Sequence, residues 1–289
     1  MNSSELILND DGSIYHLGIR TEHCAPLILT VGDPERVPTV SQFFDCIEFR
    51  HQKREICIHT GKLGNQSVSV ISTGMGTDNI DIILNEIDAL FSFDLNTGKP
   101  LHSHNPLTFI RLGTSGAIQA DIGLDSLVVA EGAIGFDNLM HYYDPKMCDH
   151  PLAEALHSHM GNPKKINHPY YALADEGLFA TCVDLGMQPG ITATNAGFYA
   201  PQGRHLRTQK VVDYGNDHLS QFEYKNSVIT NFDMETAGIY GLSRVLGHKA
   251  ISISTILANR INGAFSENAD KAVHDMIAIV TSAIKEGKL

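Results

Sequence analysis

Positive charge is scarce in this 289-residue sequence: 21 Lys and Arg residues face 33 Asp and Glu residues, which gives a formal net charge of −12. Binding to a nucleic-acid backbone needs clustered Lys and Arg, so this composition argues against DNA or RNA as the main partner. If the ligand is an anion, a local arginine pocket must hold it against the overall negative field of the protein.

Cysteine and long apolar runs are also scarce. The five cysteines are odd in number and form no CxxC pair, so we expect reduced thiols and not a disulfide framework. No stretch approaches the ~20 apolar residues of a membrane span. The opening MNSSELILNDDGS lacks the basic region and apolar run of a secretory signal. The sequence thus predicts a soluble, cytoplasmic protein with no membrane partner.

Several well-known catalytic and metal-binding signatures are absent. The GxG that begins at Gly74 lacks the third glycine of a dinucleotide fingerprint, and the chain has neither the GKS or GKT of a phosphate-binding P-loop nor the GxSxG of a serine hydrolase. Two HSH triplets, at 102–104 and 157–159, have no third ligand nearby in sequence, which predicts structural or surface histidines. Nothing here indicates a metal site or an organic cofactor.

Apolar residues make up 43% of the chain, enough for a sizeable core, and they fall into two patterns. Short apolar runs predict buried strands at 27–31, 68–72, 107–112, 127–130 and 250–257. Helical spacing predicts a helix over 77–91 with Thr77 or Asp78 as N-cap, a second from Glu235 to Leu246 that ends at Gly247, and a last one from about Ser266. This alternation predicts an α/β fold with a mostly parallel sheet, in a single domain over 1–289 with an exposed loop at 96–106.

Glycine turns at predicted strand ends are where α/β proteins place ligands. VGDPER (31–36) combines Gly32, which permits close backbone approach, with the fixed charge of Arg36. RLGTSGAI (111–118) sets Arg111 and Thr114 beside two glycines, which predicts a tight turn that carries donors. ISTGMGTDN (71–79) resembles a strand-to-helix turn whose free N–H groups bind anions. Each could be an ordinary structural turn, but three at strand ends favour a binding site.

Two further segments carry recognition chemistry. NFDMETAGIYG (231–241) sets Asp233 and Glu235 at a helix start, where carboxylates are favoured on dipole grounds alone but can also bind two vicinal hydroxyls. NAGFYAPQGRHLR (195–207) has too many Gly and Pro residues for a helix and does not alternate like a strand, so we predict a loop. Its aromatic, amide and guanidinium side chains suit recognition, although the aromatic pair alone could be core packing.

Taken in order, YHLG (15–18), GDPER, RLGTSGAIQ, FYAPQGR, DMET and ILANR (256–260) resemble the nucleoside phosphorylase superfamily, and most closely its uridine-cleaving members. Any one motif is weak, but the ordered set is specific and spans nearly the whole chain. The resemblance implies a three-layer αβα sandwich around a mixed, partly barrel-like sheet. It also implies a homo-oligomer, either a dimer or a hexamer of dimers, with active sites shared between subunits.

The resemblance also assigns individual residues. The positions that match the phosphate site are Gly32, Arg36, Arg111 and Thr114, with Arg54 lent by the neighbouring subunit. The positions that match the ribose site are Met234, Glu235 (at the 2′ and 3′ hydroxyls) and the neighbour's His16 (near the 5′ hydroxyl). The positions that match the base site are Phe198, Gln202, Arg204 and Arg260.

The base-binding residues suit uracil. Its edge presents O2, N3–H and O4, so the amide of Gln202 can accept from N3–H and donate to a carbonyl, while Arg204 donates to O4. Cytosine would set an amino donor against these donors. The same donors would stabilise a departing uracil anion. The resemblance therefore implies phosphorolysis of uridine to uracil and ribose 1-phosphate without a metal or organic cofactor, catalysed by Arg36, Arg111, Gln202, Arg204 and Glu235.

Alternatives exist on the same fold. DMETAGIYG is also similar to purine nucleoside phosphorylases and nucleosidases, but these carry an acid that protonates the purine N7 where this chain has Asn259 and Arg260. A hydrolase would have no use for Arg36 and Arg111 together, since water needs no anion site. A non-catalytic nucleoside-binding protein would bind its ligand without turnover.

The chain departs from the uridine-cleaving pattern in three places. Asp233 stands where a glutamate is usual, and its role cannot be assigned from the sequence. Residues 75–79 differ from the segment that helps to bind a potassium ion between subunits, although Glu55 is retained. The 96–106 insertion has no counterpart that would assign it a role.

Overall fold

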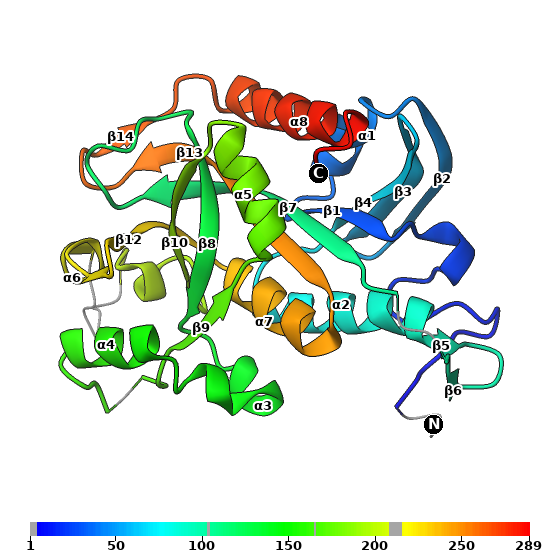
Figure 1. The fold of residues 1–289 in the computed structure, drawn as a ribbon, viewed down its shortest axis with the longest axis horizontal. Coiled ribbons are helices and arrows are strands. Elements are labelled where there is room, and N and C mark those ends of the chain that lie inside the picture. Colours follow the sequence, from blue (N-terminus) through cyan, green and yellow to red (C-terminus); the bar gives the residue numbers. More distant parts are fainter. Residues whose placement is uncertain (1–4, 103–104, 165, 208–215) are drawn as a thin grey trace.

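A mixed 12-stranded sheet forms the centre of the computed structural model, which describes residues 5–102, 105–164, 166–207 and 216–289 (Figure 1). The strand order is β11-β12-β10-β8-β13-β7-β1-β4-β3-β2, and β14 and β9 pair with β13 and β8. The strands are β1 (Leu27–Val31), β2 (Cys46–Lys53), β3 (Ile56–Leu63), β4 (Gln66–Ser72), β7 (Thr108–Ala117), β8 (Leu127–Gly135), β9 (Tyr170–Leu173), β10 (Gln188–Thr194), β11 (Glu223–Tyr224), β12 (Ser227–Asp233), β13 (Lys249–Asn259) and β14 (Ala264–Phe265).

Part of this sheet closes on itself. Strand β7 pairs in parallel with β1 and β13, and β10 pairs in parallel with β8 and β12. Antiparallel pairing of β8 with β13, and of β12 with β7, closes a ring of five strands in the order β7, β13, β8, β10 and β12. Strand β1 lies outside this ring. The expectation of a mixed, partly barrel-like sheet is therefore confirmed, and the pairing is more mixed than the strand–helix alternation alone predicts.

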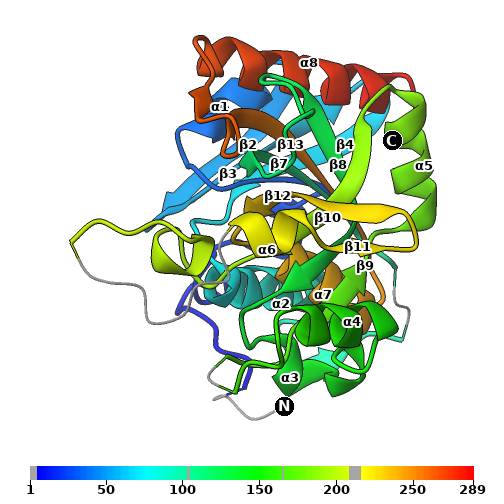
Figure 2. The same cartoon turned by 90° about the vertical axis from the view of Figure 1, so that its left-hand side faces the viewer.

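Helices cover both faces of the sheet, as Figures 1 and 2 show for α8 on one side and α2 and α7 on the other. The side chains of β1 alternate between two cores: Ile28 packs with α2 (Thr77–Ser92) and α7 (Thr236–Leu246), whereas Leu29 packs with α8 (Ala269–Lys285). This burial on both faces makes the three-layer αβα sandwich. The remaining helices are α1 (Arg36–Ser41), α3 (Met140–Tyr143), α4 (Pro151–His159), α5 (Glu176–Asp184), α6 (Asn216–Ser220), and the 3-10 turns η1 (Thr21–His23), η2 (Pro145–Met147) and η3 (Ala200–Gln202).

The predicted helices are present, and each needs a small correction at its start. Helix α7 begins at Thr236, one residue after the predicted Glu235, which is its N-cap, and it ends at Gly247 in the left-handed conformation, as expected. The N-cap of α2 is Gly76, with φ of 97°, and not Thr77 or Asp78. Helix α8 begins at Ala269, three residues after Ser266, because the Oδ1 atom of its N-cap Asn268 accepts from the Lys271 backbone N–H.

The tight turn predicted at RLGTSGAI is wrong, because these residues continue strand β7 as far as Ala117. Strand β13 pairs with β7 from Thr108 to Ala117, which carries the extended backbone through both glycines. Gly113 is required for another reason. A Cβ at this position would lie 1.7 Å from Nη1 of Arg111, whose side chain lies across it. Gly113 is therefore needed because its missing side chain leaves room for the Arg111 guanidinium, and not because the backbone turns there.

Two peripheral expectations can also be compared with the structure. Within the predicted loop at 96–106, β6 (Lys99–Pro100) forms a small ribbon with β5 (Phe93–Asp94). The described residues from 96 to 106 are mostly exposed, and residues 103 and 104 lie outside the described part of the chain. None of the helices in the described ranges combines the length and hydropathy needed to span a bilayer.

Candidate active site

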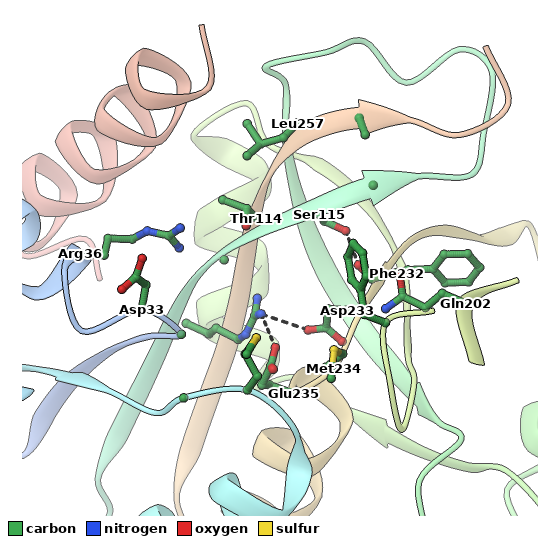
Figure 3. A pocket seen from close by; sticks show the side chains of 18 of the residues that line it. Asp33, Arg36, Thr114, Ser115, Gln202, Phe232, Asp233, Met234, Glu235 and Leu257 are labelled. Atoms are coloured by element: carbon green, nitrogen blue, oxygen red, sulfur yellow. Dashed lines mark hydrogen bonds and ion pairs between the residues drawn. The ribbon is translucent and has the colours of Figure 1, made fainter. Parts of the chain in front are cut away.

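One pocket of about 610 Å³ collects most of the predicted site residues. Strands β1 and β7 are adjacent and parallel, so the residues that follow Val31 and those from Arg111 onward meet at one edge of the sheet. Strands β10 and β12 are likewise parallel, with Thr194 opposite Asp233, so the loop after β10 lies beside the turn after β12. Figure 3 shows Arg36 on one side of the pocket, Gln202 on the opposite side, and Met234 and Glu235 between them.

The end of the pocket that is predicted to bind phosphate, called the phosphate end below, contains the predicted set Gly32, Arg36, Arg111 and Thr114. Arg36 opens α1, and its Nη1 lies 3.5 Å from the carbonyl oxygen of Leu112 on β7. Burial, followed by the nearby charge of Arg111, lowers the pKa of Arg36, while Asp33 opposes the shift. Two guanidinium groups thus lie close enough to repel each other. An anion bound between them would relieve this repulsion.

Arg111 is buried against two carboxylates. Its Nη2 lies 2.6 Å from Oε2 of Glu235 and 3.5 Å from Oδ2 of Asp233, and Figure 3 draws these two ion pairs as dashed lines that end at Glu235 and Asp233. Burial opposes the charge of Arg111, but Asp233 and Glu235 offset it and hold its pKa above the ordinary arginine value. A residue expected to bind phosphate is therefore ion-paired to a residue expected to bind ribose.

Glu235 connects the ribose position to the start of α2. Its Oε1 accepts a hydrogen bond of 2.8 Å from the Gly76 backbone N–H. Burial raises the pKa of Glu235 despite the opposing attraction of Arg111. The predicted anion-binding turn at 71–79 therefore binds an anion in this structure, and that anion is the protein's own carboxylate. Met234 lies beside it in the pocket wall.

The end of the pocket that is predicted to bind the base, called the base end below, is formed by the predicted loop and by the turn η3 within it. Gln202 is only 5% exposed, and its Oε1 accepts a hydrogen bond of 2.5 Å from Nη1 of Arg204. The same Nη1 also donates to the Phe198 carbonyl at 2.8 Å, and the guanidinium stacks on the Phe198 ring at 3.8 Å. All three side chains line the pocket. Gln202 is thus fixed in the wall by the residue predicted to share the base with it.

Arg260 lies behind this loop and is not part of the pocket lining. Its Nη1 donates to the backbone carbonyl of Gln202 at 2.5 Å, and its guanidinium lies over the ring of Phe232 at 5.3 Å. Burial and the neighbouring charge of Arg204 lower the pKa of Arg260 to about 10. In this structure Arg260 supports Gln202, and it adds to the positive potential at the base end.

His16 and Arg54 lie outside the main pocket, in a second cavity of about 70 Å³. The Nδ1 atom of His16 lies 2.5 Å from Oε1 of Glu86, whose carboxylate also accepts the His16 backbone N–H. Glu55 lines both cavities, so the two are neighbours. The prediction that His16 and Arg54 complete the site of an adjacent subunit stays a prediction.

Several residues of the pocket wall carry no ligand-binding assignment from the sequence. These residues are Asp33, Pro34, Gly113, Ser115, Gly116, Phe232, Leu257, Ala258 and Phe265. The wall also contains Glu55, Gly74, Met75 and Asp233, which the sequence singled out without a settled role. Asp33 and Ser115 lie beside predicted residues in the same motif, so the motif itself is a usable signal for them. Phe265 carried no such signal. It reaches the pocket because β14 turns back onto the end of β13.

The side-chain amide of Asn259 makes four hydrogen bonds to backbone groups around it. Its Nδ2 donates to the carbonyls of Gln119 and Ile122, and its Oδ1 accepts from the N–H groups of Ile261 and Asn262. Asn259 therefore holds the end of β13 in place. An amide in this position offers no proton to a ligand.

The histidine-rich segments form no metal centre in the residues that the structure describes, where no group of three or more His, Cys, Asp or Glu side chains could hold an ion. On α4, the ring of His157 packs against that of His168 at 4.3 Å, and Nε2 of His159 lies 2.9 Å from the His218 carbonyl. The structural role predicted for this HSH triplet fits these contacts. His104 of the other triplet lies outside the described residues.

The geometry combines three chemical functions in one cavity. Paired arginines can hold an anion at one end, a buried carboxylate can accept hydrogen bonds from hydroxyl groups in the middle, and an amide with a guanidinium can read a planar polar edge at the other end. Such an arrangement suits a ligand with an anionic, a sugar-like and a heterocyclic part.

Comparison with known proteins gives consistent results. The family model of the phosphorylase superfamily matches residues 26–285. A uridine phosphorylase of Thermococcus kodakarensis is 27% identical over 98% of this chain and 90% of its own length. A DeoD-type purine nucleoside phosphorylase of Listeria welshimeri is 23% identical over 93% of this chain and 97% of its own. The crystal structure of a Trypanosoma brucei nucleoside phosphorylase, described as showing uridine phosphorylase activity, superimposes with a TM-score of 0.87 at 29% identity and covers 97% of this chain and 99% of that one.

Proposed function

The chain belongs to the phosphorylase superfamily, and we propose that it catalyses the reversible phosphorolysis of uridine to uracil and ribose 1-phosphate. One observation carries the choice of base: the buried Gln202 amide stands in the pocket wall, tied to Arg204 at 2.5 Å, at the opposite end from Arg36 and Arg111. A pyrimidine edge with two carbonyls and one N–H fits this amide–guanidinium pair.

The charges of the pocket suit this reaction. Cleavage of the glycosidic bond leaves negative charge on the base and positive character on the ribose. Arg204, with Arg260 behind it, places positive potential where the uracil anion forms, so the site binds the departing base more strongly than the intact nucleoside. Phosphate held by Arg36 and Arg111 would attack C1′ from the other end, and fixed positioning of the two reactants supplies much of the rate. The reaction as proposed requires no metal or organic cofactor.

A purine substrate is the second candidate, because purine nucleoside phosphorylases are among the relatives. Purine cleavage is helped by an acid that protonates N7. In this chain the corresponding stretch ends in Asn259, whose amide is bound to four backbone groups, and in Arg260. This difference favours the pyrimidine.

We also propose that the active enzyme is a homo-oligomer. His16 and Arg54 lie in a cavity next to the main pocket and outside it, where a second copy of the chain could use them. In this proposal they complete the ribose and phosphate sites of the neighbouring subunit, and the protein acts in the cytoplasm.

The test is chromatography of uridine, inosine and cytidine incubated with the purified protein, each with and without inorganic phosphate. We expect uracil from uridine only when phosphate is present, and neither hypoxanthine nor cytosine at a comparable rate. Uracil without phosphate would identify a hydrolase, and faster release of hypoxanthine would identify a purine enzyme. Binding of uridine without any turnover would identify a nucleoside-binding protein.

A further inference from the structure

Two carboxylates share the single guanidinium of Arg111, and they are held very differently. Asp233 accepts at Oδ1 from the Thr194 hydroxyl at 2.7 Å, and at Oδ2 from both the backbone N–H and the hydroxyl of Thr236. Its own backbone carbonyl accepts from the Asn195 N–H at 2.9 Å. Asp233 thus joins the ends of β10 and β12 to the first residue of α7, and its side chain is fixed on every side.

Glu235 is held by fewer groups. It lies in the turn between β12 and α7, and its carboxylate is bound by Nη2 of Arg111 at 2.6 Å and by the Gly76 N–H at 2.8 Å. A carboxylate has about four acceptor positions, so Glu235 has room for the two hydroxyls of a ribose. The ion pair of Glu235 with Arg111 nevertheless competes with hydrogen bonds from the ribose hydroxyls.

Charge balance links the two residues. Arg111 is 7% exposed, and a buried guanidinium without a counter-ion is strongly destabilised. If Glu235 were the only counter-ion, a bound nucleoside that weakened the Arg111–Glu235 pair would leave the buried guanidinium of Arg111 poorly neutralised, and nucleoside binding would be weaker as a result. Asp233, at 3.5 Å from the same Nη2, can stay paired with Arg111 throughout.

We propose that Asp233 is a positioning residue that acts as the permanent counter-ion of Arg111 and thereby leaves Glu235 available to the ribose hydroxyls. This inference rests on the proposed nucleoside phosphorolysis and gives a role to the aspartate that the sequence left unassigned. It concerns the ribose, and it is independent of which base the enzyme prefers.

The main test is Asp233→Asn, which removes the charge and keeps the shape. The asparagine Oδ1 can still accept from Thr236, and its amide can donate to the Thr194 hydroxyl, so the joint between β10 and α7 can be preserved. Glu235 then remains as the carboxylate that neutralises Arg111. We expect KM for uridine to rise about fivefold or more, with no increase in KM for phosphate. The ratio of kcat/KM for uridine to that for 2′-deoxyuridine should fall. In the variant Glu235 stays paired with Arg111, so its hydrogen bond to the 2′ hydroxyl is weaker.

Three other variants separate charge from architecture. Thr194→Val removes the hydrogen bond to Asp233 and the acceptor of the Ala237 backbone N–H but keeps the charge of Asp233, so it should lower Tm without the KM split. Asp233→Glu keeps a carboxylate at this position, so its affinity for uridine should be close to that of the wild type and higher than that of Asp233→Asn. Asp233→Ser removes the charge but keeps a hydroxyl acceptor near Thr236, and it should reproduce the split, so the test does not depend on the folding of one variant.

The inference is overturned if D233N leaves KM for uridine unchanged, if both KM values rise together, or if Thr194→Val produces the same split. Failure of the proposed function is recognised separately, in the wild-type protein, as an absence of phosphorolysis. If the wild type prefers inosine, the same comparison is made with inosine and 2′-deoxyinosine, because the proposed role of Asp233 concerns the sugar.

Discussion

The two ends of the pocket are built on different kinds of structure. At the phosphate end, Arg111 and Thr114 stand on β7, which is paired with β1 and β13, and Arg111 is further held by two carboxylates. At the base end, the side chains come from a loop and mainly contact one another, and Phe198 is 50% exposed. The comparison indicates that the residues proposed to bind the anion belong to the scaffold, whereas the residues proposed to choose the base belong to a loop.

Loss of Arg111 should have the largest effect. Arg111→Met removes the phosphate donors and leaves two buried carboxylates without their counter-ion. We expect kcat/KM for phosphorolysis to fall by about 10³ for every nucleoside tested, because the phosphate end does not distinguish bases. Initial rates with uridine and inosine check this, with Tm as the control for folding. A loss confined to uridine would contradict the separation of the two ends.

Loss of Gln202 should be smaller and confined to the base. Gln202→Ala removes the amide that is proposed to face the pyrimidine edge, and we expect kcat/KM for uridine to fall by about 10² while KM for phosphate stays close to the wild-type value. Steady-state kinetics with each substrate varied in turn provide the measurement. Unchanged turnover of uridine would remove this loop from the base site.

A pair of glycine variants tests how strictly the scaffold holds Arg111. In Gly113→Ala the new Cβ would lie 1.7 Å from Nη1 of Arg111, so the guanidinium must move. We expect a loss of about tenfold in kcat/KM for phosphate, because a displaced guanidinium no longer holds the phosphate in its reactive position. The matched control is Gly123→Ala, because a Cβ there meets nothing within 4 Å. Equal effects of the two variants would show that the position of Arg111 is not critical.

The smallest effect concerns pH. Burial raises the pKa of Glu235 above its ordinary value of 4.5. Between 4.5 and the raised pKa, the folded protein binds this proton more readily than the unfolded chain, so the contribution of Glu235 to stability increases as the pH falls. Activity should move the opposite way, because protonation breaks the pair with Arg111 and weakens ribose binding. We expect a several-fold loss of kcat/KM on the acid side, at a higher pH than an ordinary glutamate would give. In Glu235→Gln, which has no carboxyl to protonate at this position, neither the gain in stability nor the loss of activity at acid pH should appear. Measurements of kcat/KM and Tm against pH check both.

The sequence motifs located the site more reliably than they described its local structure. The loop at 195–207 was predicted correctly because Gly and Pro act through local backbone geometry. RLGTSGAI was misread for the same reason: its glycines have the local signature of a turn, but pairing with β13, more than 130 residues later, keeps them in a strand. The N-cap of α2 is Gly76, one residue before the predicted Thr77, and its N–H binds Glu235, a contact between distant residues that no local pattern shows.

By itself the sequence determined the class of fold, the buried strands and helices, and the set of side chains that suits an anion, a sugar and a base, because periodicity and side-chain chemistry are local properties. Only the tertiary structure decided which of these groups contact one another. The pairing of Arg111 with Glu235 and Asp233, the bond from Gly76 to Glu235 and the support of Gln202 by Arg260 join residues 58 to 159 positions apart. Such contacts depend on the closure of the sheet through β12 and β7, and no local pattern encodes that closure.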